Sequence, residues 1–218
     1  MAAYKLHSDI FEMLKPYLKE NLNVLDFGCG QGAFSQRLVD LGMVVDACDI
    51  NTNQLKATVN RKIELDLNKE IPPDKFPYKY DIILAFEIIE HIHNPWKYLD
   101  DCLRLLKKGG IIVLTTPNIS NFISRMRFLM RGSLLAFEKT DLKHGHITPL
   151  SFVQIENLCD HFNLEILKKG HVGPIPLIHL YEFSRFSLLR NIILPLLYPF
   201  MSGPKKGRAL IYILRKNE

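Results

Sequence analysis

Hydrophobic positions follow two different periods along this chain. Short continuous apolar runs, typical of buried strands, alternate with segments in which apolar residues recur every three or four positions, as on one face of a helix. The predicted strands are VLD, MVVDACD, NRKIEL, YDIILAF and IIVLTT, and the predicted helices lie at 10–18, 33–41 and 94–106. This alternation predicts an α/β fold with a parallel sheet covered by helices on both faces.

Residues with capping preferences mark the ends of the predicted helices. Ser8 is a candidate N-cap for the first helix, and Asn94 followed by Pro95 is typical of a helix start. Gly109 and Gly110 are expected to end the third helix before the strand IIVLTT begins.

The stretch VLDFGCGQGAFSQRL, from Val24 to Leu38, combines a strand, a glycine-rich turn and a helix start. Its glycines occupy alternate positions directly after Asp26. Glycine permits positive φ and a close approach of a ligand to the backbone, and a helix N-terminus offers free N–H groups. An ordinary tight turn does not need three alternating glycines beside an aspartate. The stretch therefore predicts a ligand-binding turn.

Acidic residues stand at the ends of four predicted strands: Asp26, Asp49, Asp66 and Glu87. The carboxyl ends of parallel strands share one edge of the sheet, where open α/β sheets bind ligands. Asp49 follows the glycines by about twenty residues, a spacing that suits a contact with ribose hydroxyls. For Asp66, a helix cap is the alternative interpretation.

The glycine spacing distinguishes between two cofactor classes. Dinucleotide-binding turns usually read G-x-G-x-x-G, whereas this turn reads D-x-G-x-G-x-G, which disfavours NAD. Together with CDIN, DIILAFEIIEHIHNP and LLKKGGIIVLTTPN, the turn resembles the class I S-adenosylmethionine-dependent methyltransferases. The nearest subgroup includes the ubiquinone-pathway O-methyltransferases and many bacterial cell-surface methyltransferases. The resemblance covers roughly residues 20–173.

This resemblance implies a Rossmann-like, doubly wound, seven-stranded sheet that is mostly parallel, with an antiparallel last strand and helices on both faces. LEILKKGHVG and ALIYILRK would then form the sixth and seventh strands of one domain spanning residues 1–218.

The resemblance also implies that S-adenosylmethionine is the cofactor. Its amino group is expected near Asp26, its ribose on Asp49, and its adenine beside Asp66 and Leu67. Cys29 is expected to fill space in the turn rather than to act as a nucleophile. The expected cofactor-binding residues are Asp26, Gly28, Cys29, Gly30, Asp49, Ile50, Asp66, Leu67, Phe86 and Glu87.

Methyl transfer from a sulfonium is an in-line displacement that depends mainly on alignment of donor and acceptor. A hydroxyl acceptor also benefits from a base that takes its proton. His146 is the first candidate for this base, because relatives place a histidine-bearing loop over the acceptor site, and His91 is the second. The alternative is a surface loop with incidental histidines.

Glu87, Glu90 and His91 form the pattern E-x-x-E-H, which some relatives use to hold magnesium or a similar ion. His146 could complete such a site. Carboxylates favour magnesium or manganese and imidazole favours softer ions, so the pattern does not select the metal. Alternatively, Glu90 and His91 only shape the strand-to-helix connection.

The composition limits the remaining choices. A length of 218 residues with 47% hydrophobic content suits one core, and a net charge of +5 without a basic, aromatic-interleaved strip argues against a nucleic-acid partner. The four cysteines include no C-x-x-C pair, which predicts reduced thiols and a cytoplasmic location. The N-terminus has no apolar run typical of a secretory signal.

A long apolar insertion is expected at about 174–206, between the last two strands. Its charge-free run is too short and too interrupted by proline to span a membrane. The insertion would instead form core, a dimer face, or a peripheral contact at the inner membrane face. A second stretch, NFISRMRFLMRGSLLAF, also mixes arginine with bulky apolar residues.

These observations predict an S-adenosylmethionine-dependent methyltransferase that O-methylates a small or lipid- or glycan-linked acceptor. The alternatives are a catalytically idle S-adenosylmethionine-binding partner protein and an RNA 3′-end methyltransferase. The oligomeric state is left open.

Overall fold

The structure is a computed structural model that describes residues 4–174, 196 and 198–217. The apolar insertion expected at about 174–206 lies largely outside the described residues. Of its charge-free run, Asn191 to Pro204, the structure describes residues 196 and 198–204.

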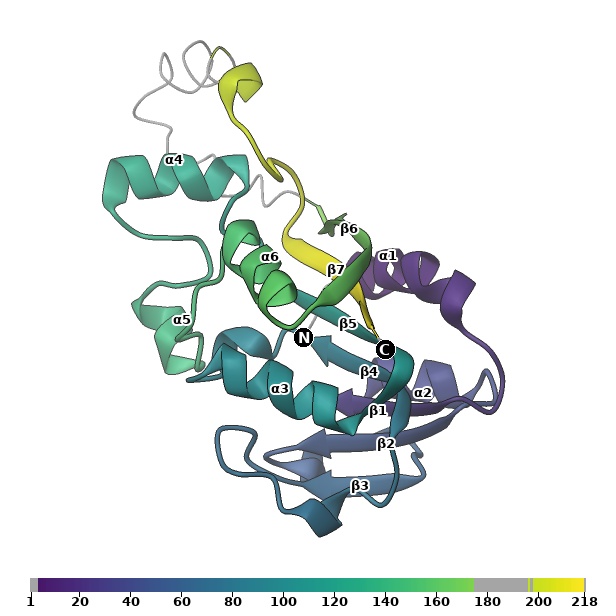
Figure 1. Ribbon diagram of the computed structural model, residues 1–218. Coiled ribbons are helices and arrows are strands. Elements are labelled where there is room, and N and C mark those ends of the chain that lie inside the picture. Colours follow the sequence, from purple (N-terminus) through teal and green to yellow (C-terminus); the bar gives the residue numbers. More distant parts are fainter. Residues whose placement is uncertain (1–3, 175–195, 197, 218) are drawn as a thin grey trace.

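One seven-stranded sheet with strand order β3-β2-β1-β4-β5-β7-β6 organises the described residues (Figure 1). Strands β3, β2, β1, β4 and β5 are mutually parallel, whereas β7 is antiparallel to both of its neighbours, β5 and β6. The expected mostly parallel sheet with an antiparallel last strand is therefore confirmed. The strands are β1 (Asn23–Phe27), β2 (Val44–Asp49), β3 (Arg61–Glu64), β4 (Tyr80–Phe86), β5 (Leu106–Pro117), β6 (Leu164–Val172) and β7 (Ala209–Lys216).

Helices cover both faces of this sheet. The buried residues of the strands alternate between two hydrophobic clusters, one on each face. In β4, Ile83 packs in a cluster with residues of α3 and α6, whereas Ile82 packs in a cluster with residues of α1 and α2. Such alternation follows from the two-residue period of a strand. The helices are α1 (Tyr4–Leu14), α2 (Ala33–Val39), α3 (Pro95–Leu105), α4 (Phe122–Arg131), α5 (Lys139–Lys143) and α6 (Phe152–His161).

Two predicted helix boundaries are wrong. Ser8 does not cap the first helix but lies inside α1, which begins at Tyr4. Gly109 and Gly110 do not end the third helix, since they lie within β5, opposite an irregularity in the register between β4 and β5. Gly109 supplies a positive φ of 70° there, which lets the strand begin before the apolar run.

The predicted start of the third helix is confirmed. The side chain of Asn94 accepts hydrogen bonds from the backbone N–H groups of Trp96 and Lys97, so Asn94 is the N-cap of α3.

The topology brings the chain segments that follow the parallel strands to one edge of the sheet. The carboxyl ends of β1, β2, β4 and β5 meet the beginning of the antiparallel β7 at this edge. Among the described residues, no helix is long and apolar enough to cross a membrane.

Candidate active site

The glycine-rich turn between β1 and α2 is fixed onto β2. The backbone N–H groups of Gly28 and Cys29 both donate to the carbonyl oxygen of Cys48, at 2.9 and 3.0 Å. Gly28 and Gly32 are closely surrounded, since a Cβ at Gly28 would lie 2.6 Å from Ile88. A Cβ at Gly30, in contrast, would have no atom within 4 Å. The turn therefore presents open backbone at Gly30.

Asp49, the last residue of β2, lies beside this open backbone. Its carboxylate accepts hydrogen bonds from the N–H of Gly30 at 2.8 Å and from the N–H of Asn51 at 3.2 Å. These bonds hold the carboxylate at the carboxyl end of the sheet. The neighbouring Ile50 is 65% exposed and lies on the same turn out of β2.

Asp26 lies beneath the turn and is almost completely buried, with 3% exposure. Burial, with a smaller contribution from the charge of Asp49, raises the pKa of its carboxyl to about 6, against the opposing effect of a hydrogen bond from the Ser35 hydroxyl. Ser35 escaped the sequence analysis, although its place in the first turn of the helix after the glycines was a usable signal. A buried carboxylate of this kind is ready to receive a positively charged group.

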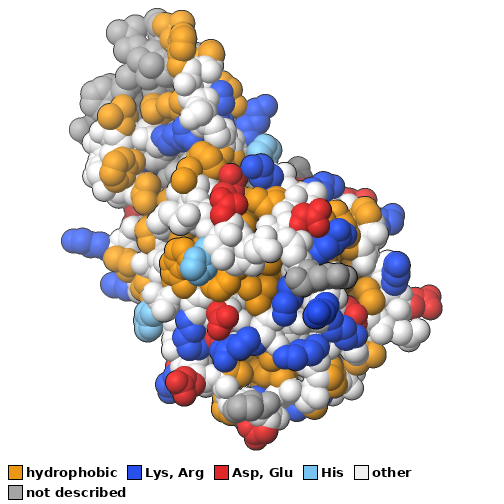
Figure 2. Space-filling model, in the orientation of Figure 1, with side chains coloured by type: hydrophobic (Ala, Val, Ile, Leu, Met, Phe, Trp, Pro, Cys, Tyr) orange, Lys and Arg blue, Asp and Glu red, His pale blue; other side chains and the backbone are white. Residues whose placement is uncertain are grey.

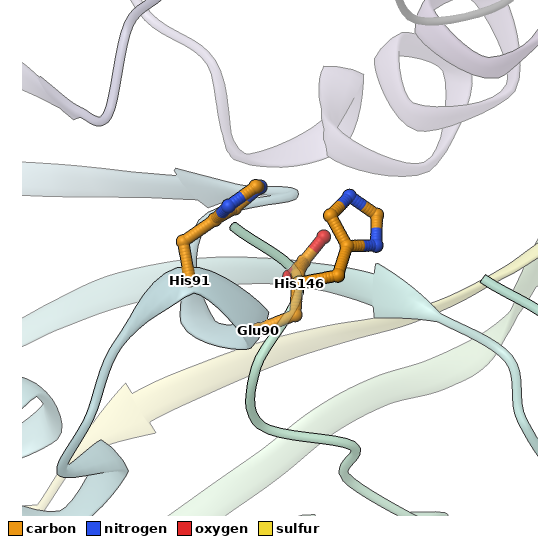
Figure 3. Close-up of side chains that lie close together, drawn as sticks. All are labelled: Glu90, His91 and His146. Carbon is orange, nitrogen blue, oxygen red and sulfur yellow. The ribbon is translucent and has the colours of Figure 1, made fainter. Parts of the chain in front are cut away.

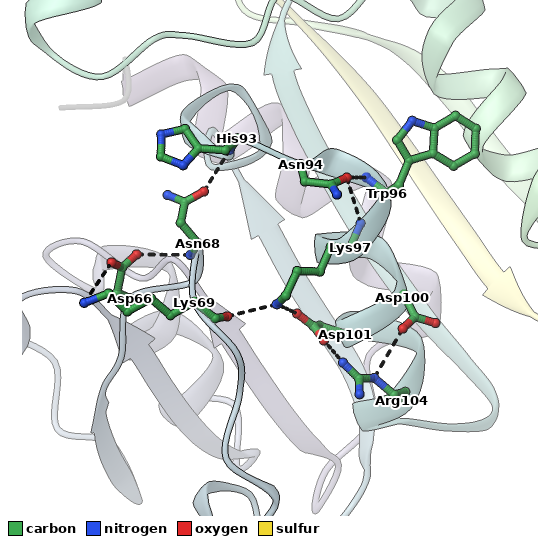
Figure 4. A network of polar contacts seen from close by, with 10 residues as sticks. All are labelled: Asp66, Asn68, Lys69, His93, Asn94, Trp96, Lys97, Asp100, Asp101 and Arg104. Atoms are coloured by element: carbon green, nitrogen blue, oxygen red, sulfur yellow. Dashed lines mark hydrogen bonds and ion pairs between the residues drawn. The ribbon is translucent and has the colours of Figure 1, made fainter.

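Asp66 stabilises a loop rather than pointing freely into a cleft. Its carboxylate accepts a hydrogen bond from the Asn68 N–H at 3.0 Å, and the Asn68 side chain accepts one from the His93 N–H at 2.8 Å (Figure 4). These bonds connect the loop after β3 to the start of α3. Leu67 is buried in the core, so only its backbone is available to a ligand.

Phe86 and Glu87 end β4. The Phe86 ring packs edge-to-face on Phe34 of α2, with ring centroids 4.9 Å apart. Glu87 has a positive φ of 49°, and its N–H lies 3.1 Å from both the carbonyl and the hydroxyl oxygen of Thr115. Burial raises the pKa of the Glu87 carboxyl, while Thr115 and Arg208 oppose the shift. Its Oε1 is buried without a hydrogen-bond partner among the described residues.

The side chains of Glu90, His91 and His146 converge (Figure 3). One ligand atom from each of the three lies within 4.8 Å of the others. Glu90 is completely buried, and its Oε2 accepts a hydrogen bond from the Thr116 hydroxyl at 3.1 Å. Burial and the charge of Glu87 raise the pKa of Glu90 well above its ordinary value. Within the described part of the chain, its Oε1 has no hydrogen-bond partner.

Backbone contacts orient both histidine rings. Nδ1 of His146 lies 2.8 Å from the carbonyl oxygen of Ala136. Because a carbonyl can only accept, Nδ1 carries the proton, and Nε2 of the neutral ring keeps its lone pair. The backbone of Gly145 hydrogen-bonds the His91 ring, whose pKa is lowered by burial and by His146.

The loop that carries His146 is anchored on Glu90. The backbone N–H groups of Ile147 and Thr148 both donate to the carbonyl oxygen of Glu90, at 2.9 and 3.0 Å. The structure thus brings His146 close to Glu90 and His91, which lie far from it in the sequence. The pair Thr115 and Thr116 supports both glutamates and was missed, although consecutive threonines at the end of an apolar strand were visible in the sequence.

Comparison with known proteins assigns the chain to a family. A family model described as a methyltransferase domain matches residues 2–169. The chain belongs to this family. It is a class I S-adenosylmethionine-dependent methyltransferase, as the sequence analysis predicted.

Relatives and solved structures agree with the assignment. The ubiquinone biosynthesis O-methyltransferase of Caulobacter vibrioides is 33% identical over 106 residues, which cover 45% of this chain and 42% of that protein. The chain therefore spans well under half the length of this relative.

Two solved structures show the same fold. An S-adenosylmethionine-dependent methyltransferase from Archaeoglobus fulgidus matches with a TM-score of 0.66 at 17% identity, covering 96% of this chain and 94% of the other. The N-methyltransferase NodS from Bradyrhizobium japonicum, bound to S-adenosylhomocysteine, matches with a TM-score of 0.59 at 12% identity, covering 97% and 86%. Both matches show that this chain shares the fold of S-adenosylmethionine-dependent methyltransferases.

The surroundings of Cys29 in the methyltransferase do not favour nucleophilic chemistry. Burial raises the pKa of the Cys29 thiol far above its ordinary value, and Asp26 and Asp49 raise it further. A thiol must ionise to become a strong nucleophile. This environment suits the space-filling role expected for Cys29.

Proposed function

We propose that this methyltransferase transfers the methyl group of S-adenosylmethionine to a hydroxyl of a small or lipid- or glycan-linked acceptor. The observation that carries this proposal is the convergence of Glu90, His91 and His146. Two of these residues closely follow Ile88, whose side chain lies against Gly28 of the glycine-rich turn. Such a cluster can remove a proton from oxygen, which a hydroxyl acceptor requires. The name of the Caulobacter vibrioides relative, an O-methyltransferase, supports the same choice of acceptor atom.

In the proposed complex, the cofactor lies over Gly28 and Gly30, with its ribose hydroxyls on Asp49. Its ammonium group faces Asp26, whose buried carboxylate gains stability from a positive neighbour. The adenine lies along Ile50, Asp66 and Leu67. Phe86, Glu87 and the turn residue Cys29 border the methionine part of the cofactor.

We propose that His146 is the base for the acceptor hydroxyl. The Ala136 carbonyl fixes the ring so that Nε2 carries the lone pair. His91 lies edge-to-face on this ring, with ring centroids 4.7 Å apart. The two imidazoles therefore border the position that the acceptor oxygen would occupy.

We further propose that Glu87, Glu90 and His91 hold a divalent ion of the magnesium type. Two observations support such an ion. Ligand atoms of Glu90 and His91 lie within 4.8 Å of each other, in a group that His146 rather than Glu87 completes. Glu87 and Glu90 each have a buried carboxylate oxygen without a partner among the described residues. The backbone bond to the His91 ring is also the support that metal-binding histidines usually have. A bound ion would lower the pKa of an acceptor hydroxyl.

We propose that the methyltransferase is one domain over residues 1–218 and works in the cytoplasm. The second proposal is supported by the four cysteines, all of which are described, buried and unpaired.

Incubation with radiolabelled S-adenosylmethionine and cell extract tests the proposed function. We expect label in a solvent-extractable or glycan fraction, and loss of most of the transfer in His146→Ala. His144→Ala is the matched control, because His144 lies in the same loop but is exposed and bonded to Thr140. Label in RNA would instead support an RNA methyltransferase, and cofactor binding without transfer to any fraction would support an idle binding protein.

The same assay tests the metal. Chelation should abolish transfer, and Glu87→Gln with Glu90→Gln should reproduce this loss. Full activity in chelator would exclude a required ion.

A further inference from the structure

Helix α4 and the segment before β7 form a projection at the carboxyl edge of the sheet, seen at the top of Figure 1. We call it the tip lobe and define it as residues 118–137, 196 and 198–208. It begins directly after β5 and ends where β7 starts. The tip lobe therefore grows out of the edge that carries the active site.

Contacts between its two segments make the tip lobe one unit. The rings of Phe122 and Tyr198 pack with centroids 5.4 Å apart. The Arg125 guanidinium donates to the carbonyl oxygen of Ser202 at 2.6 Å. The side-chain amide of Asn118 donates to two carbonyl groups in the segment 204–206, at 3.0 and 2.8 Å.

Large apolar side chains on both segments of the tip lobe face solvent. Phe128 and Leu129 of α4 are 56% and 73% exposed, and Leu196 and Phe200 are 64% and 87% exposed. Figure 2 shows hydrophobic side chains together with Lys and Arg over this projection. Exposed apolar groups gathered on one projection are typical of an interaction surface.

The charge of the tip lobe has one sign. Its sequence contains six basic residues and no acidic residue: Arg125, Arg127, Arg131, Lys205, Lys206 and Arg208. The whole chain carries a net charge of +5, so the remainder of the chain is close to neutral. Arg127 is buried and pairs with Glu138 just beyond the tip lobe, so the other five basic residues supply the positive charge beside the exposed apolar side chains.

We propose that the tip lobe docks on the surface of an anionic lipid bilayer. Phe128, Leu129 and Phe200 would enter the boundary between headgroups and acyl chains, while the exposed Lys206 contacts anionic headgroups. This division of apolar and basic groups is what interfacial membrane elements require. A twofold contact with a second copy fits less well, because it would bring two basic surfaces together.

The docked orientation places the active site next to the bilayer. The chain leaving α4 reaches Ala136, whose carbonyl holds His146, and Arg127 of α4 pairs with Glu138 in the same connection. A lipid-linked acceptor could therefore pass from the bilayer to His146 along the tip lobe. This substrate assignment rests on the proposed function, whereas the docking itself does not.

Flotation with lipid vesicles tests the docking. We expect the full chain to float with vesicles of phosphatidylglycerol and phosphatidylcholine in equal parts, but not with phosphatidylcholine alone. The double variant Phe128→Ser with Leu129→Ser should bind at least tenfold more weakly, because it removes exposed apolar area. Lys206→Gln should weaken binding by about fivefold at low salt.

Matched controls change the same chemistry elsewhere. Val153→Ser removes an apolar side chain of α6 that is 59% exposed, and Lys62→Gln removes an exposed charge of β3. Neither change should affect flotation. All variants should bind S-adenosylhomocysteine as the unchanged protein does, which separates a failure of docking from a failure of the proposed function.

Two results would overturn the docking proposal. One is folded, cofactor-binding protein that stays at the bottom of the gradient with anionic vesicles. The other is flotation that the changes at Phe128 and Leu129 leave unaltered. A vesicle-free dimer that the same double variant dissociates would assign the tip lobe to a second copy instead.

Discussion

Gly28 and Gly30 both have positive φ, but a side chain would meet different surroundings at the two positions. In Gly28→Ala the new Cβ would lie 2.6 Å from Ile88, so we expect strain and overpacking to lower the free energy of unfolding by about 2–4 kcal/mol. Gly30→Ala adds a methyl group in open space and should cost only about 1–2 kcal/mol. Urea unfolding of the two variants measures the difference.

Cofactor affinity distinguishes the same two positions in a second way. Because the open space at Gly30 is where we place the cofactor, Gly30→Ala should weaken S-adenosylhomocysteine binding in calorimetry despite its smaller effect on stability. Unchanged affinity in that variant would move the cofactor away from Gly30.

Asp26 makes the stability of the ligand-free protein depend on pH. Burial raises its pKa from an ordinary 3.8 to about 6, so its stabilising contribution is complete below about pH 4 and is lost as the pH rises through 6. Asp26→Asn removes this titration. Relative to the unchanged protein, the variant should gain about 3 kcal/mol of unfolding free energy between pH 4 and pH 8. Urea unfolding of both proteins at pH 4 and pH 8 measures this gain. If their free energies of unfolding differ by the same amount at both pH values, the prediction is wrong.

At the scale of elements, the loop before α6 positions the histidines. Gly145 has a φ of +88°, and a Cβ there would lie 2.9 Å from Nδ1 of His91. Gly145→Ala should therefore displace His91 and lower kcat by roughly tenfold or more, because reacting groups tolerate little misplacement. Affinity for S-adenosylhomocysteine should remain nearly constant.

Gly132→Ala is the matched control for this loop. Gly132 also has a positive φ, of 67°, but a Cβ there would meet no atom within 4 Å. The variant Gly132→Ala therefore introduces similar backbone strain without contacting a histidine. If both variants lowered kcat by the same factor, the loss would come from backbone strain and not from the position of His91.

The elements of this fold were predictable to the extent that they depend on local patterns. Continuous apolar runs located the strands of the sheet, and Asn94 with Pro95 located the start of α3. The strand β5 begins earlier than its apolar run because Gly109 permits an irregular register against β4, which no local pattern reveals. The approach of His146 to Glu90 was proposed from resemblance, but the hydrogen bonds that create it depend on tertiary packing across 56 positions of sequence.

At the scale of the whole molecule, cofactor binding should appear as thermal stabilisation. A ligand that binds only the folded state at a hundredfold excess over its Kd adds about 2.7 kcal/mol to the free energy of unfolding. For a chain of 218 residues this corresponds to a rise in Tm of about 5–10 °C with S-adenosylhomocysteine. NAD, which the glycine spacing disfavours, should produce no comparable rise.

Asp49 links this global effect to one carboxylate. Its bonds to the N–H groups of Gly30 and Asn51 hold it where the ribose is proposed to lie, so Asp49→Ala should weaken cofactor binding by about 1–3 kcal/mol. At an unchanged ligand concentration, the rise in Tm should then shrink by about a third if the loss is about 1 kcal/mol and almost disappear if it is about 3 kcal/mol. Asp74→Ala, at an exposed position in the connection before β4, should keep the full rise. A full rise in Asp49→Ala as well would show that the ribose is bound elsewhere, because the stabilisation measures affinity for the folded protein directly.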